Sequence, residues 1–298
     1  MVVELLALTL LRMQIAALAA VLLVLVLRGP TRRLIGARLA YRLWAVVPAA
    51  AIAAMFPSLS EALEAGAPPA PMGEGHAIAL LVVWLAGAGL TAAIVAWQEC
   101  AFRRLAARGQ AGPAVMGVLW PRIVLPADFT ERFDPEARRM IDLHERTHIQ
   151  RGDPVANLAI AAVQVLGWCN PLIHVGVVAA RLDQELACDA TVLGLRPTLK
   201  RLYAEALVKA HANMTGSPLA CFWAAHPLLL RVKMLARPEP SEDRQATGAV
   251  SIVALTVGAA LAVWCLTPRG PVPPHFNWPV AQVIEHQVDG VNLPTLHR

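Results

Sequence analysis

The chain has 298 residues, of which 57% are hydrophobic, 16% charged and 5% aromatic. Its mean hydropathy is +0.52, and so few charged side chains cannot cover a water-soluble globule of this size. The composition argues against a soluble globular protein, a disordered chain and a nucleic-acid-binding domain, and it favours an integral membrane protein. The five cysteines are scattered and form no Cys-x-x-Cys pair, which argues against a disulfide framework or a zinc ribbon.

Four apolar segments are each long enough to cross ~30 Å of hydrocarbon as a helix. They are residues 5–27, 39–59, 77–97 and 246–267. Pro48 lies inside the second segment, whereas the third and fourth contain no charged residue. The first segment is not expected to be a cleaved signal peptide, because it follows Glu4 instead of a basic start and no small-x-small cleavage site ends it.

The positions of the arginines predict the orientation, because basic residues accumulate on the cytoplasmic side of membrane spans. The segment between the first two spans and the segment after the third are rich in arginine, whereas the one between the second and third contains glutamates and no Lys or Arg. We therefore expect the N-terminus outside the cell. The predicted domains are residues 1–97 (three-helix transmembrane region), 98–245 (cytoplasmic domain), 246–267 (fourth transmembrane helix) and 268–298 (short extracytoplasmic tail).

A His-Glu-x-x-His motif spans His144 to His148. Asp134 followed by Pro135 predicts the start of a helix that runs to about Gln150, before Gly152. Residues four apart share one face of a helix, so the imidazoles of His144 and His148 can converge on one metal ion. Glu145 lies one step round the helix and is the expected general base.

A catalytic zinc site needs a third protein ligand and keeps one position open for water. Glu185 is the predicted third ligand, and Asp189, one turn later, is expected to orient a ligand histidine. Cys188 is expected to be a small buried residue beside the site. The predicted cofactor is one Zn²⁺ per chain.

Residues 155–180 contain no charged residue and look like another membrane span. A single crossing would put His144 and Glu185 on opposite sides of the membrane. Because Asn170-Pro171 interrupts the segment, we predict instead a helical hairpin that is buried in the domain or dips into the bilayer from the cytoplasmic side.

Several segments, in order, resemble the BlaR/MecR-type membrane metallopeptidases, the antirepressor family. Residues 113–126 are similar to the family's Gly-x-x-x-Pro-x-Ile-x-Leu-Pro strand, and residues 144–153 to its His-Glu-x-x-His-x-x-Arg-Gly-Asp block. Asn170-Pro171-Leu172 and the segment from Glu185 to Asp189 resemble its Asn-Pro and Glu-Leu-x-Cys-Asp elements. The resemblance covers residues 1–267.

The resemblance implies a mainly α membrane protein, with a cytoplasmic α+β zincin-like (gluzincin) domain between the third and fourth of four transmembrane helices. It implies a zinc endopeptidase of the cell (inner) membrane that cleaves a cytoplasmic or membrane-proximal protein, with a transcriptional repressor as one candidate. The best-known members have an outer penicillin-binding sensor domain. Residues 268–298 contain no Ser-x-x-Lys, and we expect no such domain here.

The expected partners are a protein substrate, the lipid bilayer and a second copy of the chain, without direct contact to nucleic acid. Two alternatives stay open: a quality-control peptidase of the Ste24/HtpX type and a non-catalytic signalling scaffold. Tyr203, His211 and His226 are candidate oxyanion donors by position in the chain alone, and Asp153 is expected to be a helix-end or packing residue. A further predicted element is an edge strand that could pair with an extended substrate, formed by Trp120, Pro121, Arg122, Ile123, Val124 and Leu125.

Overall fold

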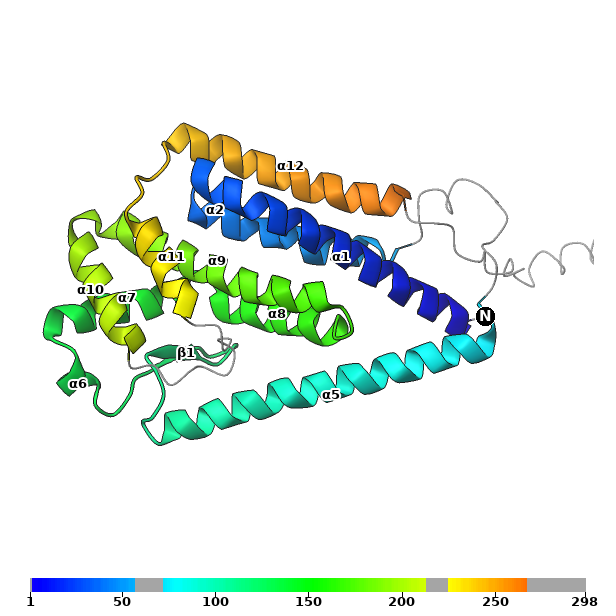
Figure 1. Ribbon diagram of the computed structural model, residues 1–298, viewed down its shortest axis with the longest axis horizontal. Helices are drawn as coiled ribbons and strands as arrows, with labels where there is room; N and C mark the ends of the chain where they lie inside the picture. The colour runs from blue at the N-terminus through cyan, green and yellow to red at the C-terminus, as the bar shows by residue number, and fades with distance from the viewer. Residues whose placement is uncertain (1, 57–71, 213–224, 267–298) are drawn as a thin grey trace, which may run out of the picture.

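The computed structural model describes residues 2–56, 72–212 and 225–266, and these are mostly helical (Figure 1). Within this part of the chain, three helices are long and apolar enough to cross a membrane. They are α1 (Val2–Leu34), α5 (Glu74–Ala107) and α12 (Glu242–Leu266). Each helix covers all or nearly all of the apolar segment predicted for it. The protein therefore has the long apolar helices of an integral membrane protein. The segment 268–298 lies outside the described residues.

The predicted span 39–59 does not form one long helix in the residues described. Its described part consists of α2 (Ala37–Arg42), the 3₁₀ turn η1 (Leu43–Ala45) and α3 (Val46–Ala53). Pro48 has no N–H to donate to the carbonyl of Trp44, and its ring crowds the preceding turn. A tightened turn at this position is the expected result of a proline inside a helix.

Helices α1, α3, α9 (Pro171–Leu195) and α12 share the larger of two apolar cores. Helix α12 packs against α3, and α2 packs against α9. In Figure 1, α12 and α1 lie along one side of the molecule, and α5 diverges from α1 toward the other end. Helix α8 (Asp153–Leu166) and α9 lie between α1 and α5. The α8–α9 pair is therefore enclosed by the long helices on two sides.

Local signals in the sequence account for the boundaries of the central helices. The Asp134 side chain accepts a hydrogen bond from the backbone N–H of Ala137 at 2.8 Å and begins α7 (Pro135–Gln150). Gly152 has φ 73°, a left-handed conformation that ends α7 and turns the chain into α8. Asn170 caps α9 through the N–H of Leu172 at 3.1 Å. The break at Asn170-Pro171 is where the sequence predicts it.

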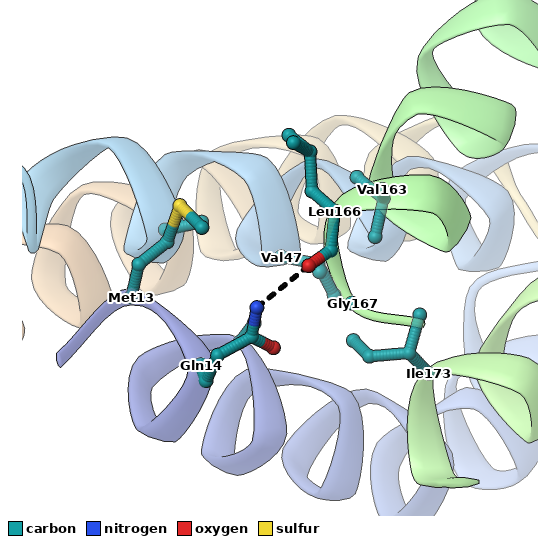
Figure 2. Close-up of a pocket in the computed structure, with 9 residues that line it drawn as sticks. Met13, Gln14, Val47, Val163, Leu166, Gly167 and Ile173 are labelled. Carbon is teal, nitrogen blue, oxygen red and sulfur yellow. Dashed lines mark hydrogen bonds between the residues drawn. The ribbon is translucent and has the colours of Figure 1, made fainter. Parts of the chain in front are cut away.

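The turn between α8 and α9 is held by side chains from the long helices. The carbonyl oxygen of Leu166, at the end of α8, accepts hydrogen bonds from Gln14 of α1 at 2.7 Å and from Trp84 of α5 at 3.0 Å. Figure 2 shows the first of these bonds beside a small pocket between α1, α3 and the α8–α9 turn. The pocket has an almost wholly apolar lining that includes Met13, Val47 and Ile173, and it holds no part of the His-Glu-x-x-His motif.

The second core lies at the end of the molecule where α6 (Phe129–Arg132), α7, the C-terminal half of α9 and α10 (Lys200–Ala212) meet. The turn η2 (Pro197–Leu199) leads into α10, and α11 (Ala225–Leu235) packs against α9. Strands β1 (Ala114–Met116) and β2 (Arg122–Val124) form an antiparallel hairpin that contacts α7. This hairpin is the strand structure among the described residues, so the predicted strand is shorter than residues 120–125.

Candidate metal centre

Helix α7 places the two motif histidines on one face, four residues apart. Their Nε2 atoms are 3.0 Å from each other, and the rings meet edge to face with centroids 4.6 Å apart. His148 is buried and His144 is largely buried. The predicted convergence of the two imidazoles is therefore present in the geometry.

The partners of the Nδ1 atoms determine which ring nitrogens carry protons. The Tyr203 hydroxyl donates its proton to Asp189 at 2.6 Å, so it accepts from the Nδ1–H of His144 at 2.7 Å. The Asp153 carboxylate likewise accepts from the Nδ1–H of His148 at 2.7 Å. When both rings are neutral, as metal binding requires, the unshared electron pair of each is then on Nε2. Two such pairs that face each other repel unless a cation lies between them, and this is the donor arrangement of a metal site.

Glu185 of α9 supplies the third set of donor atoms. Its Oε2 is 3.5 Å from Nε2 of His144, and its Oε1 is 3.5 Å from Nε2 of His148. Bonds of about 2.0–2.2 Å in a tetrahedral zinc site place two ligand atoms roughly 3.3–3.6 Å apart. The three separations observed here lie within a few tenths of an ångström of that range. The Glu185 side chain is 34% exposed, which leaves this side of the cluster open.

Arg231 of α11 holds the carboxylates behind the site. Its guanidinium donates to both oxygens of Asp189 at 2.8 Å, and its Nη1 is 3.0 Å from Oε2 of Glu185. The Asp189 side chain is 3% exposed and that of Arg231 is 12% exposed, so the pair is shielded from water. Bidentate pairs of this kind fix the orientation of the carboxylate as well as its charge.

Cys188 is buried and lies close to the same histidines. One donor atom from each of His144, His148 and Cys188 fits within 4.8 Å of the others, so the thiol is a second candidate for the third ligand. However, its Sγ is 3.5 Å from Nδ1 of His144, the nitrogen that faces away from His148, and it donates to the carbonyl of His144. This placement favours Glu185 over Cys188 as the third ligand.

Glu145 is buried beside the cluster, with 8% of its surface exposed. It interacts electrostatically with both histidines and Glu185. Burial raises the pKa of its carboxyl above the usual value, because the charged form loses its hydration. A carboxyl with a raised pKa is suited to accept and return a proton near neutral pH.

The other residues singled out by sequence have varied positions. Tyr203 is engaged with His144 and Asp189, and burial together with the Asp189 carboxylate raises the pKa of its hydroxyl. Asp153 orients His148, a contact that a packing role does not include.

The remaining candidates lie outside the histidine cluster. Trp120 is 84% exposed and lies in the loop that joins β1 and β2. The side chains of His211 and His226 lie outside the described residues. Arg231 belongs to no motif, and the sequence alone does not point to it.

Comparison with known proteins identifies the family of the chain. The model of the BlaR1 peptidase M56 family matches residues 8–76 and 67–235. Over 98 residues the chain is 32% identical to the regulatory protein BlaR1 of Bacillus licheniformis, a match that covers 33% of this chain and 16% of that protein. The family match includes the motif helix, the α8–α9 pair and Arg231. The chain is therefore a member of the BlaR1 peptidase M56 family, a family of membrane regulatory metallopeptidases.

Proposed function

We propose that this protein is a membrane-embedded zinc endopeptidase, with His144, His148 and Glu185 as the metal ligands. The observation that carries the proposal is the pair of facing Nε2 atoms with Glu185 at 3.5 Å from each. Asp153 and Tyr203 keep the protons on the two Nδ1 atoms. Arg231 and Asp189 support Glu185 and His144 from behind. Cys188 is the alternative third ligand.

The chemistry follows from the placement of Glu145. A bound zinc ion supplies Lewis-acid polarisation of the scissile carbonyl and of the attacking water. Glu145 accepts the proton of that water and passes it to the leaving amine, which completes hydrolysis of the peptide bond. The substrate, in extended form, adds to the free edge of β2 and is held by main-chain hydrogen bonds. Residues 122–124 carry this contact, and Trp120, Pro121 and Leu125 flank it.

The proposed topology has four crossings, with α2 to α3 as part of the second. The arginines near the ends of α1 and α5 support a cytoplasmic location for these two helix ends. The peptidase domain, residues 98–245, then faces the cytoplasm. The α8–α9 pair dips into the bilayer from that side, because α8, with 14 residues, reaches only about 21 Å and cannot cross it.

We propose a cytoplasmic regulator, such as a transcriptional repressor, as the substrate, in keeping with the regulatory name of the relative. The test is to incubate the zinc-loaded full chain in proteoliposomes with cytoplasmic extract and to identify new protein N-termini by mass spectrometry. Glu145→Gln is the matched control, since it alters the base and none of the proposed ligands.

New N-termini should appear with the wild type, and their rate of formation should fall by roughly 10²–10⁴ in Glu145→Gln at equal zinc content. Fragments of a repressor would support antirepressor-like regulation. Fragments of many unrelated proteins would favour the quality-control alternative. If the zinc-loaded wild type produces no cleavage that the variant lacks, the peptidase proposal is wrong and the scaffold alternative gains support.

A further inference from the structure

Three consecutive residues of α9 make polar contacts with three different parts of the protein. Asp183 contacts α1 and η1, Gln184 contacts α2, and Glu185 contacts the histidine cluster. The residues before Glu185 thus connect the metal centre directly to the first helix of the membrane region.

Asp183 is fully buried, and donors from two segments surround its carboxylate. Arg28 of α1 donates to both oxygens, at 2.7 and 3.1 Å, and the indole N–H of Trp44 donates at 2.8 Å. Arg32, one turn further along α1, is 3.4 Å away. A buried carboxylate is tolerated only with such partners, so Asp183 cannot move away from α1 without a large cost in free energy.

Gln184 forms the second connection. Its amide donates to the hydroxyl of Tyr41 in α2 at 2.9 Å. The guanidinium of Arg151 lies over the ring of the same tyrosine, 5.4 Å from its centroid, and also donates to Asp153 at 3.1 Å. Asp153 in turn accepts a hydrogen bond from His148. The Tyr41 side chain therefore contacts Gln184, which precedes Glu185, and Arg151, which binds the partner of His148.

The geometry of a helix explains why these contacts matter for Glu185. Successive residues are about 100° apart, so Asp183 and Glu185 project to nearly opposite sides of α9. Apolar contacts of Ile173 and Val177 hold the N-terminal half of α9 against the larger core. The polar contacts at Asp183 and Gln184 add directional constraints on the rotation of α9 next to Glu185. A functional site requires about 0.5 Å or 10–20° of accuracy in its side chains.

We infer that Arg28, Trp44 and Tyr41 are positioning residues for the metal centre, acting on Glu185 through Asp183 and Gln184. The first membrane helix and α2 are then part of the scaffold of the peptidase site. This inference rests on the proposed function, because it takes Glu185 as a metal ligand.

The test uses Co²⁺ bound to the full chain in detergent, because the visible absorption of Co²⁺ reports the geometry of its ligands. The variants are Tyr41→Phe, which removes one hydroxyl, and Asp183→Asn, which removes one charge. Arg38→Gln is the matched control, since Arg38 forms an exposed pair with Glu239 in the same region. Affinity is measured by chelator competition, and thermal unfolding is followed in parallel.

Both variants should show an altered Co²⁺ spectrum, and Asp183→Asn should bind roughly 10–100-fold more weakly, while Arg38→Gln matches the wild type. If Asp183→Asn does not fold, Tyr41→Phe decides the question. Wild-type spectra and affinities in folded Tyr41→Phe and Asp183→Asn would overturn the inference and leave the proposed function intact. A wild-type chain that binds neither Co²⁺ nor Zn²⁺ would instead contradict the metal site itself, and the inference with it.

Discussion

The proton positions in the histidine cluster depend on side chains that are not themselves ligands. Asp153 holds Nδ1 of His148 at 2.7 Å, and Tyr203 holds Nδ1 of His144 at the same distance. These contacts orient the rings and direct the unshared pairs of Nε2 toward Glu185. At the scale of the residue, the affinity for metal should therefore depend on Asp153 as well as on the ligands.

Asp153→Asn removes the charge while it keeps the shape of the side chain. We expect the zinc affinity to fall roughly 10–100-fold, because a neutral amide is a weaker partner for Nδ1–H than a carboxylate. The measurement is a chelator competition on the purified chain. Asp142→Asn is the control, because Asp142 lies on the exposed side of α7 and pairs with Arg146. An equal loss of affinity in both variants would contradict the role of Asp153.

Arg231→Met leaves the carboxylates of Asp189 and Glu185 without their common cation. We expect the free energy of unfolding of the metal-free chain to fall by about 3–5 kcal/mol, because the buried carboxylate of Asp189 is then left without its cation. Denaturant titration in detergent measures it. Arg103→Met removes an exposed arginine that pairs with Glu99, and its effect should be about 0.5 kcal/mol or less. A similar small effect in Arg231→Met would show that the carboxylates find other partners.

The residues of the cluster differ in how far sequence could predict them. His144, Glu145 and His148 follow from one local motif, and the pairing of Glu185 with Asp189 follows from helical spacing. Arg231 comes 42 residues after Asp189 and belongs to no motif that points to a metal. Its contact depends on how α11 packs against α9, which no local pattern contains. The role of Asp153 as the partner of His148 could be inferred from its position five residues after that histidine.

At the scale of the element, α5 and the α8–α9 turn meet through a glycine. A Cβ at Gly87 would overlap the indole ring of Trp168, whereas a Cβ at Gly89 would meet nothing within 4 Å. The indole N–H of Trp168 also donates to the carbonyl of Trp84 at 3.0 Å. Close approach of the backbone of α5 is therefore needed where the turn packs against it.

Gly87→Ala and Gly89→Ala form a matched pair with opposite expected effects. Gly87→Ala should destabilise the chain by about 1–3 kcal/mol, because Trp168 must move. Gly89→Ala should stabilise it by up to about 1 kcal/mol, because alanine favours the helix. Thermal unfolding of both variants in one detergent measures the difference. Equal shifts would mean that α5 does not pack on the turn in solution.

Local sequence signals predict the ends of these helices better than the continuity of a helix. Asp134, Gly152 and Asn170 mark boundaries because each satisfies or turns the backbone locally. The second apolar segment contains Pro48, yet its length and hydropathy predict a single span. A proline does not by itself decide between a kink and a break, because packing against α9 and α12 contributes to the outcome.

At the scale of the whole molecule, the proposed topology puts the two ends of α5 on opposite sides of the membrane. Gly73 precedes this helix and Arg108 follows it, and both are exposed. We expect a membrane-impermeant maleimide to label Gly73→Cys in intact cells and Arg108→Cys only after permeabilisation. The chain without added cysteine provides the background signal. The reverse pattern would place the peptidase domain outside the cell.

The proposed function depends on one metal ion held by His144, His148 and Glu185. The most direct test is the zinc content of the detergent-purified chain, compared with folded Glu185→Ala and Cys188→Ala. We expect about one zinc per wild-type chain, a sharp loss in Glu185→Ala and retention in Cys188→Ala. Zinc kept by Glu185→Ala and lost from Cys188→Ala would identify the thiol as the third ligand, and a folded wild type without stoichiometric metal would contradict the zinc peptidase proposal.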